Sequence, residues 1–184
     1  MRKLDGILLA VIFAVAFCHN AKAISYNEAI RQTNKLEGQL SNASFRFQEN
    51  RARRCGDHFR HAQIRGVFVL PLSESAAAYL EANRYRMASA CKLSEASVGN
   101  FNSLNSRVEK YKSSYIKSLH GFEIRAVNLA QKINRRLKLL SSNGSDSQSR
   151  ARAERLKLAR KSALAAASSA RIKIARAQMI GLAR

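Results

Sequence analysis

The sequence contains no tryptophan, a single proline and only 12 acidic residues, although it is 184 residues long. Alanine, serine, arginine and leucine dominate instead; alanine, leucine and arginine favour helices, whereas proline interrupts them. This composition is typical of long helices. The shortage of acidic side chains leaves 33 lysines and arginines largely uncompensated, so the formal net charge is +21 at pH 7.

The sequence also lacks the motifs of the common enzyme classes. It contains no G-x-S-x-G, no Walker loop, no H-E-x-x-H and no G-x-G-x-x-G. The acidic residues are dispersed and form no carboxylate pair in the sequence, and a lone histidine such as His120 is more typical of a surface than of a catalytic base. We therefore expect a protein that is not an enzyme and that uses no cofactor and no small-molecule substrate.

The first 23 residues have the pattern of a secretory signal peptide. Arg2 and Lys3 precede an apolar run over residues 7–17, and Ala21-Lys22-Ala23 matches a cleavage site. The apolar run is too short for a membrane anchor. We therefore expect residues 1–23 to be removed and the mature protein to be secreted or periplasmic.

Cleavage would leave a strongly basic chain. Losing three basic residues and Asp5 leaves 30 basic and 11 acidic side chains, a formal charge of +19. Such a charge attracts nucleic acid, anionic lipid, lipopolysaccharide or acidic glycan. The alternative is a solvated basic surface without a specific ligand.

Two cysteines, Cys55 and Cys91, would remain after cleavage. An even count in an exported chain predicts a disulfide, and closing this loop of 36 residues should stabilise the fold by about 4 kcal/mol in the chain-entropy model. The alternative is a metal site, because Cys55, His58 and His61 follow one another at gaps of two residues. Five neighbouring arginines disfavour a cation there: Arg51, Arg53, Arg54, Arg60 and Arg65.

Helix signals occur along most of the mature chain. Ser25 and Glu28 form a capping box, and apolar spacing predicts one helix from residue 25 to about 54, ended by Gly56. Ser73 predicts the start of a second helix, and an apolar stripe then recurs every three or four residues. Its phase passes unbroken through Gly99-Asn100, so we expect one coiled-coil-like helix over 73–141, although a break there is the alternative.

A segment between these two helices is apolar at its end. If Cys55 ends the first helix, about 27 Å of the second helix projects beyond it, and residues 56–72 must cover that projection. The residues from Val67 to Leu72 are therefore expected to pack onto Leu80 and Met87. The alternative is an exposed apolar tip for a partner or a bilayer.

The C-terminal part is a basic Ala/Arg-rich helix, expected over residues 150–184 after a Ser/Gly linker at 142–149. An alanine-rich stripe predicts close docking onto the long helix, and membrane binding is the alternative. Its basic residues lie mostly outside that stripe: Arg155, Lys157, Arg160, Lys161, Arg171, Lys173 and Arg176.

Two glycosylation sequons begin at Asn42 and Asn143, and they matter only in a eukaryotic secretory pathway. No motif identifies a family. In shape alone, an exported and elongated helical bundle resembles the periplasmic minor pilus subunits of conjugation and type IV secretion systems, and very basic all-helical secreted proteins include sperm egg-coat proteins of marine molluscs. Neither resemblance brings a motif, so no residue is carried over from them.

These patterns predict an all-α fold, an elongated antiparallel helical hairpin or bundle over residues 24–141 with one disulfide and the C-terminal helix beside it. The predicted function is polyanion binding through the arginines at 51–65 and the basic residues at 155–176. A scaffold subunit of a secretion, conjugation or other assembly, which pairs with partner helices or with copies of itself, is the alternative. Membrane disruption by the last helix is a third hypothesis.

Overall fold

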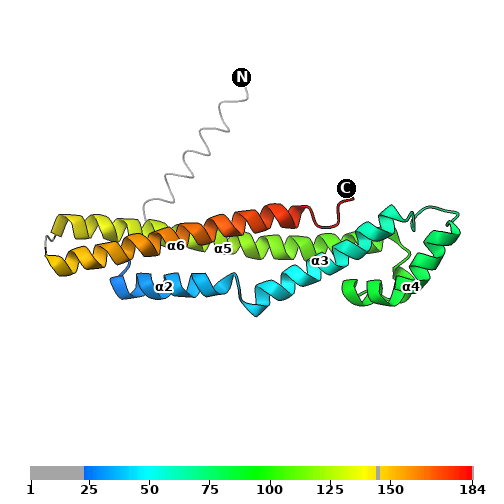
Figure 1. Ribbon diagram of the computed structural model, residues 1–184, viewed down its shortest axis with the longest axis horizontal. Coiled ribbons are helices and arrows are strands. Elements are labelled where there is room, and N and C mark those ends of the chain that lie inside the picture. The colour runs from blue at the N-terminus through cyan, green and yellow to red at the C-terminus, as the bar shows by residue number, and fades with distance from the viewer. Residues whose placement is uncertain (1–22, 144–145, 184) are drawn as a thin grey trace, which may run out of the picture.

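The computed structural model describes residues 23–143 and 146–183, and they form an elongated all-α bundle (Figure 1). The predicted signal peptide therefore lies outside the described residues, except for residue 23. The helices are α2 (Tyr26–Gln39), α3 (Ala43–Ile64), α4 (Glu74–Cys91), the short 3-10 helix η1 (Glu95–Ser97), α5 (Phe101–Asn143) and α6 (Ser147–Gln178).

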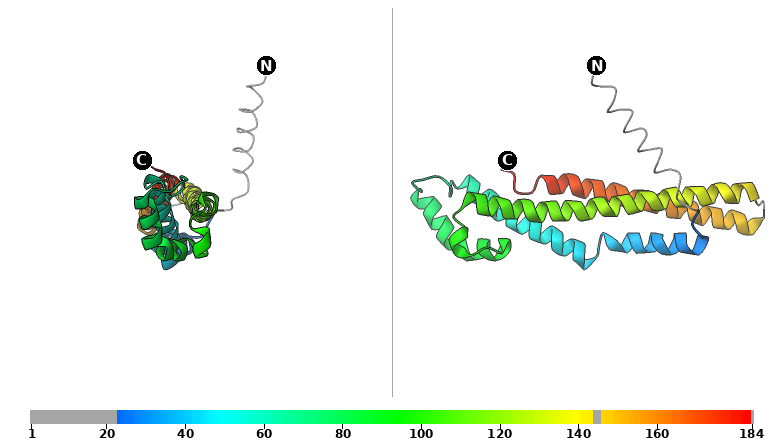
Figure 2. Two further views of the ribbon diagram at one scale, coloured as in Figure 1. Left: turned by 90° about the vertical axis from the view of Figure 1, so that its right-hand side faces the viewer. Right: turned by 180° about the vertical axis from the view of Figure 1, so that it is seen from behind.

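An antiparallel hairpin of α5 and α6 forms the long axis of the molecule. The 43 residues of α5 span about 64 Å at 1.5 Å per residue. Helices α2 and α3 follow one another along one side of this hairpin, and α4 lies at the end remote from the α5–α6 turn (Figures 1 and 2). The fold class predicted from the sequence is thus confirmed.

The prediction of one helix over residues 25–54 is wrong, because the chain breaks after Gln39. The side chain of Asn42 accepts a hydrogen bond from the Ser44 backbone N–H at 3.1 Å and thereby begins α3. Helix α3 then continues through Gly56 to Ile64. Gly56 does not end the helix; it is buried where the C-terminal turn crosses α3, and a Cβ there would lie only 2.4 Å from Ile180 Cγ2.

The prediction of one helix over 73–141 is also wrong. Helix α4 ends at Cys91, where Lys92 adopts a left-handed backbone with φ of 51°. The side chain of Asn100 accepts a hydrogen bond from the Ser103 N–H at 3.2 Å at the start of α5. Both Val98 and Leu104 are nevertheless buried. The stripe kept its phase because the segments on either side of the break contact the same core.

The segment 56–72 is not the extended cover that we expected. Its first half belongs to α3, which runs antiparallel beside α4 (Figure 1), and the rest forms the connection that leads into α4. Of the apolar residues at its end, Val67 is buried in the core as predicted, whereas Leu70 is 86% exposed. The segment is therefore packed at one end and exposed at its tip.

The core of the molecule is divided into two clusters. One, which we call the end core, lies among α3, α4 and the first half of α5 and includes Phe59, Leu80, Met87, Leu104 and Val108. The other, the shaft core, lies among α2, α6 and the second half of α5 and includes Leu36, Phe122, Ile133, Leu156, Ala159, Ala163, Ala170, Ile174 and Ala177. The predicted docking of the alanine stripe onto the long helix is thus confirmed.

Serine and aspartate caps begin several of these helices. Ser25 accepts from the Glu28 N–H at 3.3 Å and Ser73 from the Ala76 N–H at 3.2 Å, as the sequence predicts. Asp146 accepts from the Ser149 N–H at 3.1 Å. Helix α6 therefore begins at Ser147, and α5 extends to Asn143, so helices reach into the segment 142–149 that we expected to be a linker.

Candidate polyanion-binding site

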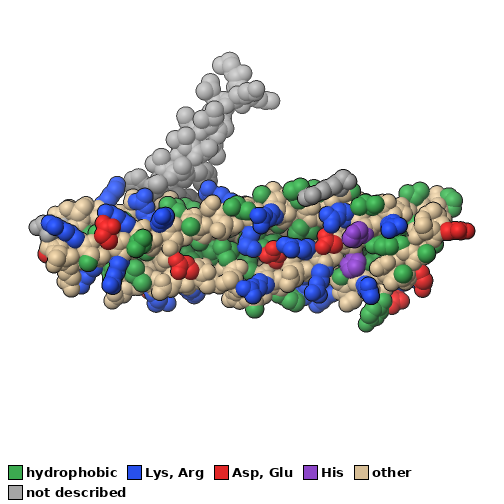
Figure 3. All heavy atoms as spheres, viewed as in Figure 1, with side chains coloured by type: hydrophobic (Ala, Val, Ile, Leu, Met, Phe, Trp, Pro, Cys, Tyr) green, Lys and Arg blue, Asp and Glu red, His purple; other side chains and the backbone are tan. Residues whose placement is uncertain are grey.

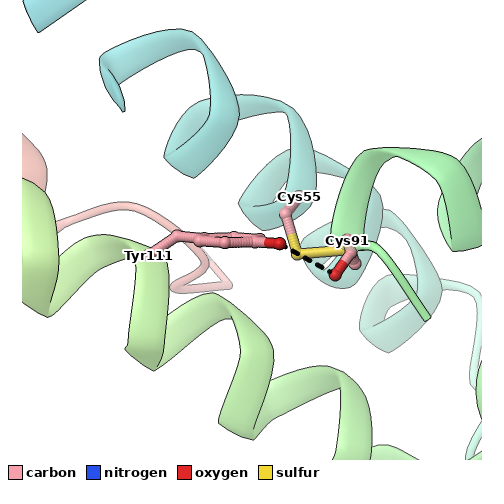
Figure 4. The surroundings of a disulfide bond; sticks show 3 residues. All are labelled: Cys55, Cys91 and Tyr111. Atoms are coloured by element: carbon pink, nitrogen blue, oxygen red, sulfur yellow. Dashed lines mark hydrogen bonds between the residues drawn. A yellow bond between two sulfur atoms is a disulfide. The ribbon is translucent and has the colours of Figure 1, made fainter. Parts of the chain in front are cut away.

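The predicted disulfide between Cys55 and Cys91 is present and joins α3 to the end of α4, with a Cα–Cα distance of 4.9 Å (Figure 4). The Tyr111 hydroxyl of α5 donates a hydrogen bond to the Cys91 carbonyl oxygen at 3.2 Å. The Cys55 sulfur is therefore not a free thiolate for a metal ion. Within residues 23–143 and 146–183, no group of three His, Cys, Asp or Glu residues is placed to hold a metal ion.

A groove of about 570 Å³ lies beside this disulfide, between α3 and α4. We call it the α3–α4 groove. Its cationic lining residues are Arg51, Arg54, Arg86 and Lys92, and none of the described residues that line it is acidic. Two of these cations, Arg51 and Arg54, belong to the arginine cluster predicted from the sequence; the other two come from α4 and its C-cap.

Aromatic rings flank the same groove. Phe47 on α3 is 58% exposed and Tyr85 on α4 is 75% exposed, and both line the groove. The Arg51 guanidinium lies 4.3 Å from the centroid of the Phe47 ring and 5.4 Å from that of Tyr111. These cation–π contacts hold Arg51 in place without neutralising its charge.

The pKa of His58, which lines the groove, is sensitive to the charges around it. Burial lowers the pKa of this imidazole, and the positive charges of His61 and Arg86 lower it further, against an opposing effect of Asp57. The neighbouring arginine is thus close enough to disfavour a second positive charge. The lowered pKa disfavours a positive charge on His58 itself, so the charge of the groove comes from its arginines and lysine.

Two further grooves have the same character. One, the α5–α6 groove, has about 690 Å³ near the turn between those helices and is lined by five cations: Lys138, Arg150, Lys157, Arg160 and Lys161. The other, of about 400 Å³ between α2 and α5, is lined by Arg31, Lys35, Arg125 and Lys132. Neither has an acidic residue among the described side chains that line it.

Several of the predicted polyanion-binding residues already have carboxylate partners. Ion pairs join Arg53 to Glu49 at 2.8 Å, Arg60 to Asp57 at 3.2 Å, Lys157 to Glu154 at 2.7 Å, Lys173 to Glu49 at 3.0 Å and Arg171 to Glu123 at 2.5 Å. Another, Arg65, lies 5.8 Å from the Tyr79 ring centroid, and Arg160 donates to the Asn134 side-chain oxygen at 2.8 Å. Four of the predicted cations have no carboxylate, amide or aromatic partner among the residues that the structure describes: Arg54, Arg155, Lys161 and Arg176.

One of these carboxylates, Glu49, connects three helices. Besides Arg53 on its own helix, it accepts hydrogen bonds from the Tyr115 hydroxyl of α5 and from Lys173 Nζ of α6, each at 3.0 Å. Burial alone would raise the pKa of Glu49, but these donors outweigh burial and the pKa lies below its ordinary value. Lys173 thus joins α6 to α3, which is a structural role.

The predicted cations do not form one continuous patch. Arg51 and Arg54 line the α3–α4 groove, whereas Lys157, Arg160 and Lys161 line the α5–α6 groove. Sequence reasoning missed Arg86, Lys92, Lys138 and Arg150, and the whole α2–α5 groove. The disulfide could have revealed Lys92, because pairing Cys55 with Cys91 also brings their chain neighbours Arg54 and Lys92 close together.

On the face shown in Figure 3, lysine and arginine side chains occur along most of the molecule, except at its right-hand tip, where the visible charged side chains are acidic. None of the described helices is both long and apolar enough to cross a membrane. No protein-family model matches the chain, and no curated protein or solved structure matches it either.

Proposed function

We propose that this protein is a non-enzymatic binding protein for polyanions and that its basic grooves are the binding sites. One observation supports this most directly: three grooves between different pairs of helices are lined by four or five cations each, and the described linings contain no carboxylate. Each groove brings four or five cations from neighbouring helices together, although Arg31 and Lys157 also pair with Glu28 and Glu154. This grouping favours anion binding over a merely solvated basic surface.

The mechanism is charge neutralisation with counterion release. Arginine guanidinium groups form paired hydrogen bonds to phosphate or sulfate, and lysine acts as a point charge. A polyanion that contacts several grooves would release condensed counterions, so its affinity should fall steeply with salt. The Cys55–Cys91 bond supports an oxidising compartment, and therefore an exported protein, as the place of this activity.

Binding to a heparin fragment and to duplex DNA tests the proposal. We expect the logarithm of the association constant to fall linearly with the logarithm of the salt concentration, with a slope that reports several neutralised phosphates. Two neighbouring residues provide a matched pair of variants: Arg54→Ala removes a cation without a described carboxylate partner, and Arg53→Ala removes one paired with Glu49.

Arg54→Ala should weaken binding more than Arg53→Ala, although each removes one positive charge. Equal effects would mean that only net charge matters and that the grooves are not sites. Affinity that is unchanged between low and high salt, or the absence of binding to either polymer, would contradict the whole proposal.

A scaffold role is a second candidate, favoured by the outer face of α6. Leu158, Ala165, Ile172 and Met179 recur every seven residues along the exposed side, opposite the alanines that pack on α5. Such a stripe fits the seam of a further helix. Sedimentation equilibrium tests self-pairing: a monomer at high protein concentration and high salt would eliminate a second copy as the occupant.

A further inference from the structure

The α3–α4 groove has two walls that a covalent bond holds together. Arg51 and Arg54 lie on the α3 wall, and Arg86 lies on the α4 wall. The disulfide (Figure 4) joins the two walls, because Cys55 follows Arg54 directly and Cys91 precedes Lys92 directly. The groove is therefore formed before any ligand binds, which reduces the entropy lost on binding.

Its lining is rich in hydrogen-bond donors and poor in strong acceptors. Three guanidinium groups and one ammonium group can only donate. The described lining residues include no carboxylate that would repel a phosphate, and the oxygen acceptors present are the neutral side chains of Asn50, Ser89 and Tyr85. The phosphodiester and deoxyribose units of a DNA strand present acceptors and no hydroxyl donor along the backbone, which fits this lining.

The rings of Phe47 and Tyr85 provide the second kind of contact. Each comes from a different wall, and both are more exposed than buried. A cationic groove with exposed aromatic rings is the usual arrangement for single-stranded nucleic acid, because the backbone follows the cations and unpaired bases stack on the rings. Duplex DNA hides its base faces and cannot use these rings.

From these features we propose that the α3–α4 groove binds single-stranded DNA, with phosphates at Arg54, Arg86 and Lys92 and a base stacked on Tyr85. This inference rests on the proposed polyanion binding and assigns a ligand class to one of its grooves. Bases are expected to stack in a manner that tolerates any sequence, since every base has a flat face.

The backbone at Lys92 adds an independent observation. Its φ of 51° is a left-handed conformation, and glycine or asparagine usually occupies this position after a helix. A lysine is less favourable there than glycine, yet its side chain lines the groove. Lys92→Gly should therefore leave the thermal unfolding temperature unchanged or higher while it weakens DNA binding.

The experiment compares three probes by fluorescence anisotropy in the intact, oxidised protein: an oligothymidylate, an abasic strand of the same length, and a heparin fragment. The abasic strand keeps every phosphate but has no bases. We expect the oligothymidylate to bind at least about fivefold more tightly than the abasic strand, which is the lower end of the stacking contribution of one base.

Variants locate the contact. Tyr85→Ala should weaken oligothymidylate binding by about fivefold or more and leave the abasic strand unaffected, whereas Tyr85→Phe should bind both as the natural protein does. Arg54→Ala should weaken both strands, and Arg46→Ala, an exposed residue of the same helix outside the groove, provides the control. Because Tyr85 is largely exposed, its removal should not unfold the protein.

Three results would overturn this inference, and they differ in whether the proposed polyanion binding remains supported. Equal binding of the two strands, with no effect of Tyr85→Ala, would refute base stacking but keep polyanion binding. A tighter complex with heparin that depends on Tyr85 would make the groove a glycan site. Failure of all three probes to bind would refute the proposed function itself.

Discussion

The end core and the shaft core hold helices together by different means. The end core combines a disulfide with aromatic rings: the Phe68 and Phe101 centroids are 5.0 Å apart, and those of Phe59 and Phe101 are 5.3 Å apart. The shaft core has no disulfide; it also contains a ring pair, Phe45 and Phe122 with centroids 6.0 Å apart, but alanines such as Ala163 and Ala170 let the α5 and α6 backbones approach closely. Long helices provide enough contact area for small residues to suffice, whereas the short α4 needs a covalent bond and large rings.

The two regions meet at Glu49 and at the C-terminal turn. Glu49 accepts from donors of α5 and α6, and Gly181 lies against Val108 and Phe59 of the end core. Damage to either core can therefore reach the other through these contacts. The predictions that follow test how far the two regions are independent, from the largest expected effect to the smallest.

Loss of the disulfide should have the largest effect. In Cys55→Ser/Cys91→Ser, the unfolded chain is no longer constrained by the 36-residue loop, and the free energy of unfolding should fall by about 4 kcal/mol. Hydrogen exchange should increase most in α3 and α4 and least at the turn between α5 and α6. Uniform loss of protection along the whole molecule would show that the two cores unfold as one unit.

Enlarging an alanine in the shaft should have the next largest effect. Ala163 is fully buried between α5 and α6, so Ala163→Leu should lower the free energy of unfolding by about 1–3 kcal/mol because the backbones must move apart. Ala165→Leu, two residues later on the exposed side of the same helix, is the matched control and should be nearly neutral. Urea unfolding of the two variants measures the difference.

Two glycines test the contact between the C-terminal turn and α3. Gly56→Ala would place a Cβ 2.4 Å from Ile180 Cγ2 and 3.1 Å from the Gly181 backbone nitrogen, and should destabilise the protein by about 1–2 kcal/mol even though alanine favours helices. Gly38→Ala meets no atom within 4 Å and should stabilise it by about 0.5–1 kcal/mol. Opposite signs are the expected result in thermal unfolding; equal signs would show that the turn is not docked.

Acid should weaken the link at Glu49. Because its pKa is lowered in the folded protein, its contribution to stability is present above the unfolded pKa near 4.5 and is lost as the pH falls through the folded value. Glu49→Gln should therefore lower the free energy of unfolding by about 1 kcal/mol at pH 7 and make unfolding less sensitive to pH below 5. If natural protein and variant lose stability in parallel on acidification, the link contributes nothing.

Local features of the structure were predictable because the residues that cause them are close in sequence. Ser25 and Ser73 cap helices through hydroxyl groups that lie three residues from their partners, and the alanine stripe of α6 follows from helical periodicity alone. The break after Cys91 was not predictable from the apolar stripe. A turn that restores the same helical phase leaves no mark in periodicity, and only Lys92 and Asn100 reveal it.

The candidate site also contains some residues that the sequence predicts and others that only the fold reveals. Arg51 and Arg54 share a cluster in the sequence and share a groove in the fold, whereas Arg86 and Lys92 join them only because α4 runs back beside α3. Conversely, Arg53 and Lys173 belong to basic clusters but are bound by Glu49. Residues one position apart on a helix, such as Arg53 and Arg54, point in different directions, so the packing of the helices decides which cations meet.

By itself, the sequence determined the helical class, the excess of positive charge, the pairing of Cys55 with Cys91 and the alanine face of α6, because each depends on composition, count or short-range spacing. The tertiary structure alone decided where α3 ends, where the long helix is interrupted, and which cations line a groove beside exposed rings. The physical reason is that these properties depend on contacts between residues distant in the chain. Gly56 continues a helix because it is packed against the C-terminal turn, and Lys173 is not free to bind a ligand because it forms an ion pair with Glu49 on another helix.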